Sequence, residues 1–169
     1  MPATIHNSGC PIHFNSVDYN EVNAFLNIHS YSQIFILVDE NTHHFCLPDF
    51  TAHLETQSPI EIIEIDAGEI HKTLETCNGV WHALSELGAD RKSLLINLGG
   101  GVVTDLGGFV ASTFMRGIDF LNIPTTLLAM VDASVGGKTG VDLGNLKNQV
   151  GVIPVSYTHL RAHETEADL

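Results

Sequence analysis

Basic side chains are scarce in this sequence, and their positions suggest that it binds an anion. The chain has seven lysine and arginine residues against 20 aspartate and glutamate residues, which gives a net charge of −13. Phosphate groups require clustered cations and hydrogen-bond donors. The pattern favours an anionic ligand over random surface placement, because four basic residues stand beside glycine-rich or polar loops near the ends of expected strands: Lys72, Arg116, Lys138 and Lys147.

A run of three glycines, Gly99–Gly101, offers the clearest phosphate-binding loop. Glycine lets the backbone pass close to a ligand. A helix that begins after the loop presents free N–H groups and a positive dipole end. The run departs from the G-x-G-x-x-G fingerprint because Thr104 stands where the third glycine would be. The loop alone therefore leaves open a glycine-rich turn without a ligand.

A second lysine, Lys138, stands among glycines in the segment Ser134–Gly140. The segment is not a P-loop, because the first glycine of that pattern is missing upstream, and nucleotide triphosphate hydrolysis is rejected on this ground. A lysine between glycines can still reach into a site, although Asp132 offers it a structural salt bridge as an alternative. Glu69 and Lys72, three residues apart, fit a helix-surface pair as well as a ligand contact.

Short apolar runs alternate with helical spacing, which predicts a mostly parallel α/β sheet of the Rossmann-like kind with helices packed on it. Ligands of such sheets sit outside the carboxyl ends of the strands. Here those ends carry Asp39, Asp66–Glu69, the glycine run and Pro124–Thr126. The predicted strands are Ile34–Val38, Ile60–Ile65, Ser93–Leu98 and Ile118–Ile123, and the predicted helices lie between Lys72 and Gly88 and from Val102 to Met115.

The bulk properties indicate one ordinary globular domain in the cytoplasm. With 169 residues, 44% of them hydrophobic, the chain is long and apolar enough for a core. Its acidity argues against nucleic acid and anionic membranes as partners. We expect no signal peptide or membrane span. Three cysteines, without a Cys-x-x-Cys pair, fit reduced thiols better than a disulfide framework.

Three segments together resemble the 3-dehydroquinate synthases, a family of sugar phosphate cyclases. They are Gly99–Gly117, Ile123–Val141 and Lys147–Gly151, within a resemblance that is dense from Ile34 to Ile153. The resemblance implies that residues 1–154 are the amino-terminal NAD-binding domain of such an enzyme. It also implies that the helical carboxy-terminal domain of the family is absent from this chain.

The resemblance also implies the roles of individual residues. The cofactor NAD would be bound by Asp39, Glu69, Lys72, Gly100, Gly101, Val102, Val103, Thr104, Asp105, Thr125, Thr126, Lys138 and Lys147. The catalytic residues would be Asp132, Lys138, Lys147, Asn148 and Arg116, with Arg116 binding the substrate phosphate, commonly across a dimer interface.

The implied reaction converts 3-deoxy-D-arabino-heptulosonate 7-phosphate into 3-dehydroquinate and phosphate, in the shikimate pathway to aromatic amino acids. NAD oxidises one hydroxyl transiently, phosphate leaves by elimination, the hydride returns, and an aldol step closes the ring. A divalent metal, zinc or cobalt, polarises the oxidised oxygen. The complete enzyme is expected to be a cytoplasmic homodimer with a small phosphorylated substrate.

The sequence departs from the family after the Lys147–Asn148 segment. The family's metal ligands, a glutamate and two histidines, lie further downstream, and no residue here is assigned to a metal. His43 and His44 are expected at the surface. His159 and His163 have the i, i+4 spacing of a zinc pair, but residues 155–169 resemble the translation of a transposon-type sequencing adapter. We therefore expect a non-native tail, the alternative being a natural short one.

Three functions remain to be separated by experiment. The first is the synthase, with this chain inactive alone. The second is another sugar phosphate cyclase or a related NAD-dependent polyol or glycerol-phosphate dehydrogenase, which would produce free NADH. The third is a non-catalytic NAD-binding module, against which the presence of Asp132, Lys138 and Lys147 argues.

Overall fold

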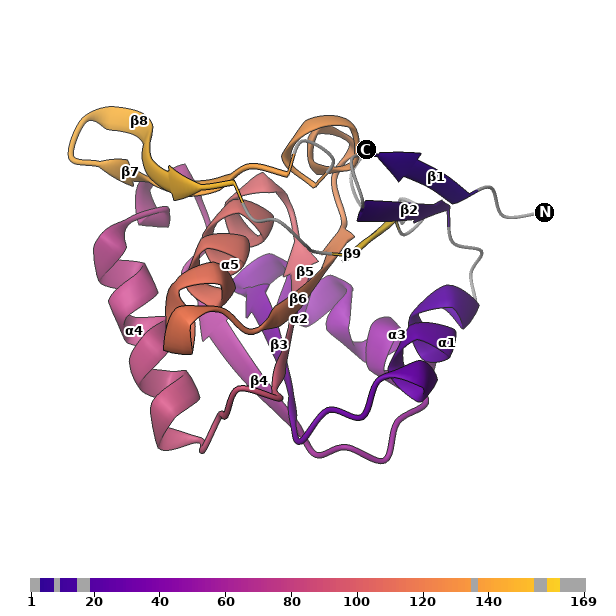
Figure 1. Ribbon diagram of the computed structural model, residues 1–169. Helices are drawn as coiled ribbons and strands as arrows, with labels where there is room; N and C mark the ends of the chain where they lie inside the picture. The colour runs from indigo at the N-terminus through magenta and orange to yellow at the C-terminus, as the bar shows by residue number, and fades with distance from the viewer. Residues whose placement is uncertain (1–3, 8–9, 15–18, 135–136, 154–157, 162–169) are drawn as a thin grey trace.

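A seven-stranded, mostly parallel sheet forms the centre of the computed structural model (Figure 1). The structure describes residues 4–7, 10–14, 19–134, 137–153 and 158–161. The strand order is β1-β2-β9-β6-β5-β3-β4. The strands of this sheet are β1 (Thr4–Asn7), β2 (Cys10–Phe14), β3 (Ile34–Asp39), β4 (Ile60–Ile65), β5 (Leu94–Gly99), β6 (Asp119–Pro124) and β9 (Thr158–Arg161).

The four predicted strands are confirmed, each within about one residue of its predicted bounds. Strands β4, β3, β5 and β6 are neighbours and run parallel, so their carboxyl ends meet at one edge of the sheet. That edge brings Asp39, Gly99 and Pro124 to the same end of the molecule. The predicted α/β class is therefore confirmed, with only the β1–β2 pair antiparallel within the sheet.

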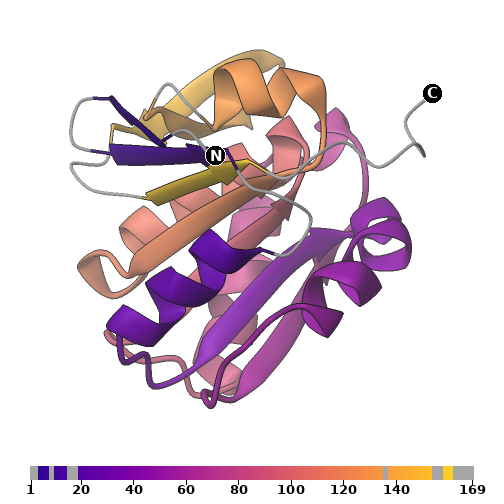
Figure 2. The same cartoon turned by 90° about the vertical axis from the view of Figure 1, so that its right-hand side faces the viewer.

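Helices cover both faces of the sheet, as Figures 1 and 2 show. One apolar cluster joins α4 and α5 to the sheet, and a second cluster joins α1 and α3 to its other face. Strands β3 and β5 are buried on both faces, which explains their continuous apolar sequences. The helices are α1 (Asn20–Ile28), α2 (Glu40–Phe45), α3 (Leu47–Ala52), α4 (Leu74–Glu86) and α5 (Gly101–Thr113).

The two predicted helices are present as α4 and α5, with local reasons for their ends. Thr73 caps α4, since its hydroxyl oxygen accepts the Thr76 backbone N–H at 3.2 Å. Gly88, with φ +81°, follows the end of α4. Helix α5 ends two residues earlier than predicted because Phe114 adopts an extended backbone with ψ 126°, and Met115 then adopts φ 49°. The short turn η2 (Phe114–Arg116) then leads into β6.

A separate antiparallel hairpin, which the sequence did not predict, lies beside α5 at the carboxyl edge. Its strands are β7 (Thr139–Leu143) and β8 (Leu146–Val152). Gly108 of α5 approaches it so closely that a Cβ atom there would stand 2.3 Å from Thr139 Cγ2. Two short turns complete this edge, η1 (Glu69–His71) after β4 and the π-helical turn η3 (Ala129–Ala133) after β6.

The expected non-native tail, residues 155–169, lies largely outside the described residues. Within it, β9 pairs in parallel with β6 and with β2. Strand pairing does not test the origin of the segment, which stays a prediction. Among the residues whose side chains are described, Cys46 and Cys77 form no disulfide, and no helix there is long and apolar enough to cross a membrane.

Candidate functional site

The glycine run forms the turn between β5 and α5, and neighbouring side chains crowd its first two glycines. A Cβ atom on Gly99 would lie 2.6 Å from Val103, and one on Gly100 would lie 3.3 Å from Thr126 Cγ2. The Gly99 carbonyl accepts the Thr125 N–H at 3.0 Å, which ties the loop to the end of β6. Helix α5 begins without a side-chain cap, so its first N–H groups are available to an anion.

The side chains that follow the glycine run divide between the interior and the site. Val103 and Thr104 are fully buried, and the Thr104 hydroxyl donates to the Gly100 carbonyl at 3.1 Å. Their contribution to a ligand is therefore limited to backbone groups. Val102 is half-buried, and the partly exposed Asp105 carboxylate borders a cleft.

A compact group of charges joins three elements beside this loop. Lys72, from the turn after β4, is only 4% exposed, and its Nζ lies 3.0 Å from Glu69 Oε1 and 3.5 Å from Asp105 Oδ2. Lys147, from β8, reaches the same Glu69 Oε1 with its Nζ at 3.7 Å. The Glu69–Lys72 contact is therefore no ordinary helix-surface pair, since Lys72 is buried among residues distant in sequence.

Burial and neighbouring charges shift two pKa values in this group. Burial raises the pKa of the Asp105 carboxyl from 3.8 to about 6; Lys72 opposes that rise, while Glu69 and Asp132 add to it. Burial alone would lower the pKa of Lys72. The hydrogen bond to Glu69 and the charge of Asp105 outweigh that effect and raise it above 10.5.

A cleft of about 360 Å³ opens next to Asp105. Its lining brings together three predicted catalytic residues, Asp132, Lys138 and Asn148. Among the ion pairs of the residues described, none joins Asp132 to Lys138, so the structural salt bridge considered as an alternative is not formed. The complete lining is Asp105, Asp132, Ala133, Lys138, Thr139, Gly140 and Asn148.

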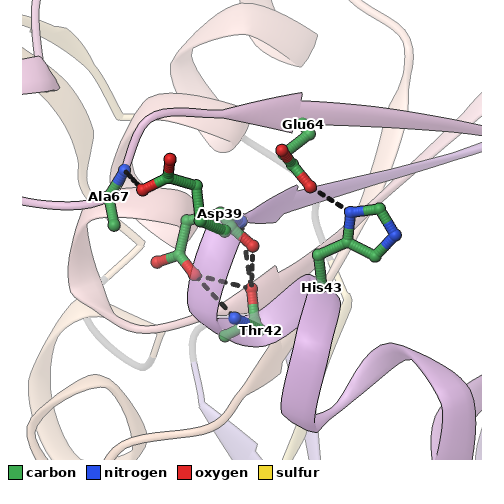
Figure 3. Close-up of polar contacts among 6 residues, drawn as sticks. Asp39, Thr42, His43, Glu64 and Ala67 are labelled. Atoms are coloured by element: carbon green, nitrogen blue, oxygen red, sulfur yellow. Dashed lines mark hydrogen bonds and ion pairs between the residues drawn. The ribbon is translucent and has the colours of Figure 1, made fainter.

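Asp39 lies at the carboxyl end of β3 and has a local role (Figure 3). Its Oδ1 accepts the Thr42 N–H at 2.8 Å, and the Thr42 hydroxyl oxygen accepts the Asp39 N–H at 3.0 Å, so the pair caps α2. In the same view His43 contacts Glu64 of β4. As expected, His43 and His44 are both exposed.

Arg116 is the predicted site residue that lies apart from the others. It follows α5, which begins at the glycine loop and extends roughly 20 Å away from it at 1.5 Å per residue. Its side chain is exposed, and its backbone adopts φ 72°. A contribution of Arg116 to this cleft in the same chain is therefore excluded, while its predicted action across a dimer stays a prediction.

Two polar residues beside the cleft were not singled out from the sequence. Thr139 lines the cleft, and its hydroxyl donates to the Val152 carbonyl at 3.3 Å. Asp142 accepts the Asn148 backbone N–H with its Oδ1 at 2.7 Å and donates its own N–H to the Lys72 carbonyl at 2.9 Å. Both lie in the hairpin that the sequence did not predict. A run of β-branched residues and glycine from Thr139 to Val141 was the available signal.

The site suits a dinucleotide better than a metal ion. The glycine turn and the uncapped start of α5 offer backbone N–H donors to a phosphate. A carboxylate near the loop can accept hydrogen bonds from hydroxyl groups. In contrast, no three histidine, cysteine, aspartate or glutamate side chains gather as a metal site among the described side chains. We therefore derive no chemical step through a metal held by this part of the chain.

The fold is a Rossmann-like α/β domain, with the candidate site at the carboxyl edge of its sheet. The family profile described as 3-dehydroquinate synthase N-terminal matches residues 62–163. The chain belongs to this family, as its resemblance predicted.

Relatives of this chain are longer than it is. The 3-dehydroquinate synthase of Parabacteroides distasonis is 47% identical over 132 residues, which cover 78% of this chain and 37% of that protein. The solved 2-epi-5-epi-valiolone synthase from Streptomyces hygroscopicus, with NAD+ and Zn2+ bound, is 28% identical with a TM-score of 0.77, covering 94% of this chain and 44% of that one. A 2-deoxy-scyllo-inosose synthase complexed with carbaglucose-6-phosphate, NAD+ and Co2+ shares the fold, with a TM-score of 0.80 and 24% identity over 95% of this chain and 44% of that one.

Proposed function

We propose that this chain is the NAD-binding part of a 3-dehydroquinate synthase, which converts 3-deoxy-D-arabino-heptulosonate 7-phosphate into 3-dehydroquinate and phosphate in the shikimate pathway. The main support for the proposal is that charged residues from separate parts of the sequence lie together at one site. Lys72, Asp105 and Lys138 come from three separate segments of the chain, yet they meet beside the glycine turn. Membership of the family supports the choice of reaction.

The residues around the glycine turn would bind the nucleotide. Backbone N–H groups of Gly101 and Val102 at the start of α5 face the pyrophosphate, where the helix dipole favours negative charge. The carboxylates of Asp39, Glu69 and Asp105 can accept hydrogen bonds from ribose hydroxyls. Bound NAD supplies the chemistry of taking up and returning a hydride.

The cleft residues would hold the substrate beside the nucleotide. Lys138 offers a mobile cation with three donors to an anionic sugar acid. Asp132, exposed at the mouth, can orient a hydroxyl or accept its proton, and Asn148 can donate to a neighbouring oxygen. Lys147 lies beside Glu69 and thus borders both the nucleotide and the substrate region.

The proposed enzyme also needs a metal ion and a partner subunit. A divalent metal, zinc or cobalt, would be held by residues outside 1–154. The solved valiolone synthase contains NAD+ and Zn2+, which supports both cofactors. We further propose a cytoplasmic homodimer in which Arg116 reaches the substrate phosphate of the partner.

The test measures phosphate release from the seven-carbon substrate by a full-length protein that contains this sequence. We expect catalytic release of phosphate and 3-dehydroquinate without net NADH. Net NADH production would instead indicate a polyol or glycerol-phosphate dehydrogenase, and turnover of another sugar phosphate would indicate another cyclase. Tight NAD binding with no turnover of any of these would favour the non-catalytic module.

The 169-residue chain alone is the companion sample in this assay. We expect it to release no phosphate, because the residues described supply no metal centre. Phosphate release by the purified chain, abolished by Lys138→Ala, would overturn this part of the proposal.

A further inference from the structure

The β7–β8 hairpin contains a bulge that carries two of the predicted catalytic residues. In the pairing register, Val141 faces Val150 and Leu143 faces Leu146. One residue of β7, Asp142, therefore lies opposite three residues of β8. Those three are Lys147, Asn148 and Gln149. Bulges disrupt the hydrogen-bond ladder and redirect side chains, so this irregularity decides where Lys147 and Asn148 point.

Asp142 replaces the missing ladder contact of the bulge with its side chain. Asn148 has φ 51°, a left-handed conformation that is unfavourable for most residues and tolerated by asparagine. Its backbone N–H donates to Asp142 Oδ1 at 2.7 Å. A charged acceptor at this distance makes a strong hydrogen bond. The carboxylate therefore stabilises the bend at Asn148.

The backbone of Asp142 also ties the hairpin to the nucleotide side of the site. Its N–H donates to the Lys72 carbonyl at 2.9 Å, and Thr73 pairs with it as an isolated parallel bridge. This contact holds β7 against the turn that carries Glu69 and Lys72. Across that junction, Lys147 Nζ approaches Glu69 Oε1 at 3.7 Å.

We propose that Asp142 is a positioning residue, which fixes the Lys147–Asn148 bulge at the cleft and links it to the Lys72 turn. It does not line the cleft, so it acts through the residues that it holds. Its catalytic consequence rests on the proposed function, whereas its effect on the bulge does not. The two consequences can therefore be tested separately.

The first experiment measures amide hydrogen exchange at Asn148 by NMR on the 169-residue chain. Asp142→Ala removes the acceptor, and we expect exchange of the Asn148 amide to accelerate about tenfold or more. Asp142→Asn keeps an oxygen at the same position and should stay within about threefold of the original chain. Asn145→Ala, on the exposed tip of the same hairpin, is the matched control and should change nothing at Asn148.

Unchanged exchange at Asn148 in Asp142→Ala would overturn the proposal. Dispersed amide signals from β3 and β5 report that each variant is folded. If Asp142→Ala loses them, Asp142→Leu takes its place, because leucine has nearly the shape of aspartate but no hydrogen-bond acceptor. Exchange of the Asn148 amide should accelerate about tenfold or more in that variant as well.

The second experiment measures kcat and KM in the full-length protein. Asp142→Ala should lower kcat about tenfold or more while the Kd for NAD changes less than about threefold, and Asp142→Asn should restore most of the loss. An inactive original protein contradicts the proposed function and leaves the exchange result to decide on Asp142. An active protein with full kcat in Asp142→Ala contradicts the positioning role.

Discussion

Replacing Asp105 with asparagine should change how the stability of the chain depends on pH. Burial raises the pKa of this carboxyl from 3.8 to about 6 in the folded protein, and its side chain is 19% exposed. Between these two pH values the folded state holds the proton more tightly than the unfolded state. The contribution of Asp105 to the free energy of unfolding therefore falls as pH rises from about 4 to 6.

The magnitude follows from the size of the pKa shift. A pKa rise of about two units corresponds to a loss of stability of about 3 kcal/mol, at 1.36 kcal/mol per unit. This loss is absent below the pKa of the unfolded state and complete above the pKa of the folded state. Asp105→Asn removes the titrating group and with it this pH-dependent loss. The difference in stability between the variant and the original chain should thus shift by up to about 3 kcal/mol in favour of the variant between pH 4 and pH 7.

Urea unfolding followed by tryptophan fluorescence measures this difference. Trp81 is the single tryptophan, and its Nε1 donates to the Val110 carbonyl of α5 at 3.3 Å, so it reports on the helix that carries Asp105. Asp90 is the control of opposite sign, because hydrogen bonds from Ser32 and the Lys92 backbone lower its pKa. Asp90→Asn should lose stability relative to the original chain as pH rises. If the difference in unfolding free energy between Asp105→Asn and the original chain stays constant from pH 4 to 7, burial does not raise the pKa of Asp105.

Four other substitutions test packing, capping and chemistry. Gly107→Ala should lower the free energy of unfolding by about 1–3 kcal/mol, because a Cβ atom there would stand 2.0 Å from Asn97 Oδ1. Gly79→Ala should instead stabilise α4 by about 0.5–1 kcal/mol, because nothing lies within 4 Å of a Cβ atom at that position. Equal urea midpoints for the two variants would contradict this account of the packing. Thr73→Ala should cost about 1 kcal/mol in the same assay, since it removes the cap of α4, and an unchanged midpoint would show that the cap contributes nothing. Lys138→Ala in the full-length protein should lower turnover more than NAD affinity, and unchanged turnover would favour the binding-only function.

The parallel core was predictable because its physical signals are local. Continuous apolar runs such as Phe35–Val38 occur where a strand is buried on both faces, and glycine after such a run marks the turn into a helix. The β7–β8 hairpin was not predictable in this way. Its glycines, Gly140 and Gly151, serve close backbone contact, since a Cβ atom on Gly151 would stand 2.3 Å from the Thr139 carbonyl oxygen. They resembled loop residues in the sequence.

The candidate site was predictable as a set of residues, but its pairings were not. Parallel topology brings the ends of β3, β4, β5 and β6 together, so the loops that follow them had to converge. The burial of Lys72 depends on Asp105, 33 residues away, and on Glu69, three residues away. The spacing in the sequence suggests only the contact between Lys72 and Glu69. Arg116 was grouped with the other basic residues in the sequence, yet it lies in η2, beyond the far end of α5, and its predicted role across a dimer stays a prediction.

These ion pairs change how the proposed site would bind an anionic ligand. The sequence suggested that Lys72 and Lys147 grip phosphate oxygens directly, yet both already face Glu69, and Lys72 also faces Asp105. Two cations and two carboxylates together leave this group without a net positive charge when all are ionised. In the proposed NAD complex, the negative charge of the pyrophosphate would therefore be met mainly by the backbone N–H groups at the start of α5. In that proposed complex the carboxylates would accept hydrogen bonds from sugar hydroxyl groups, so this group of charges would recognise hydroxyls instead of binding phosphate.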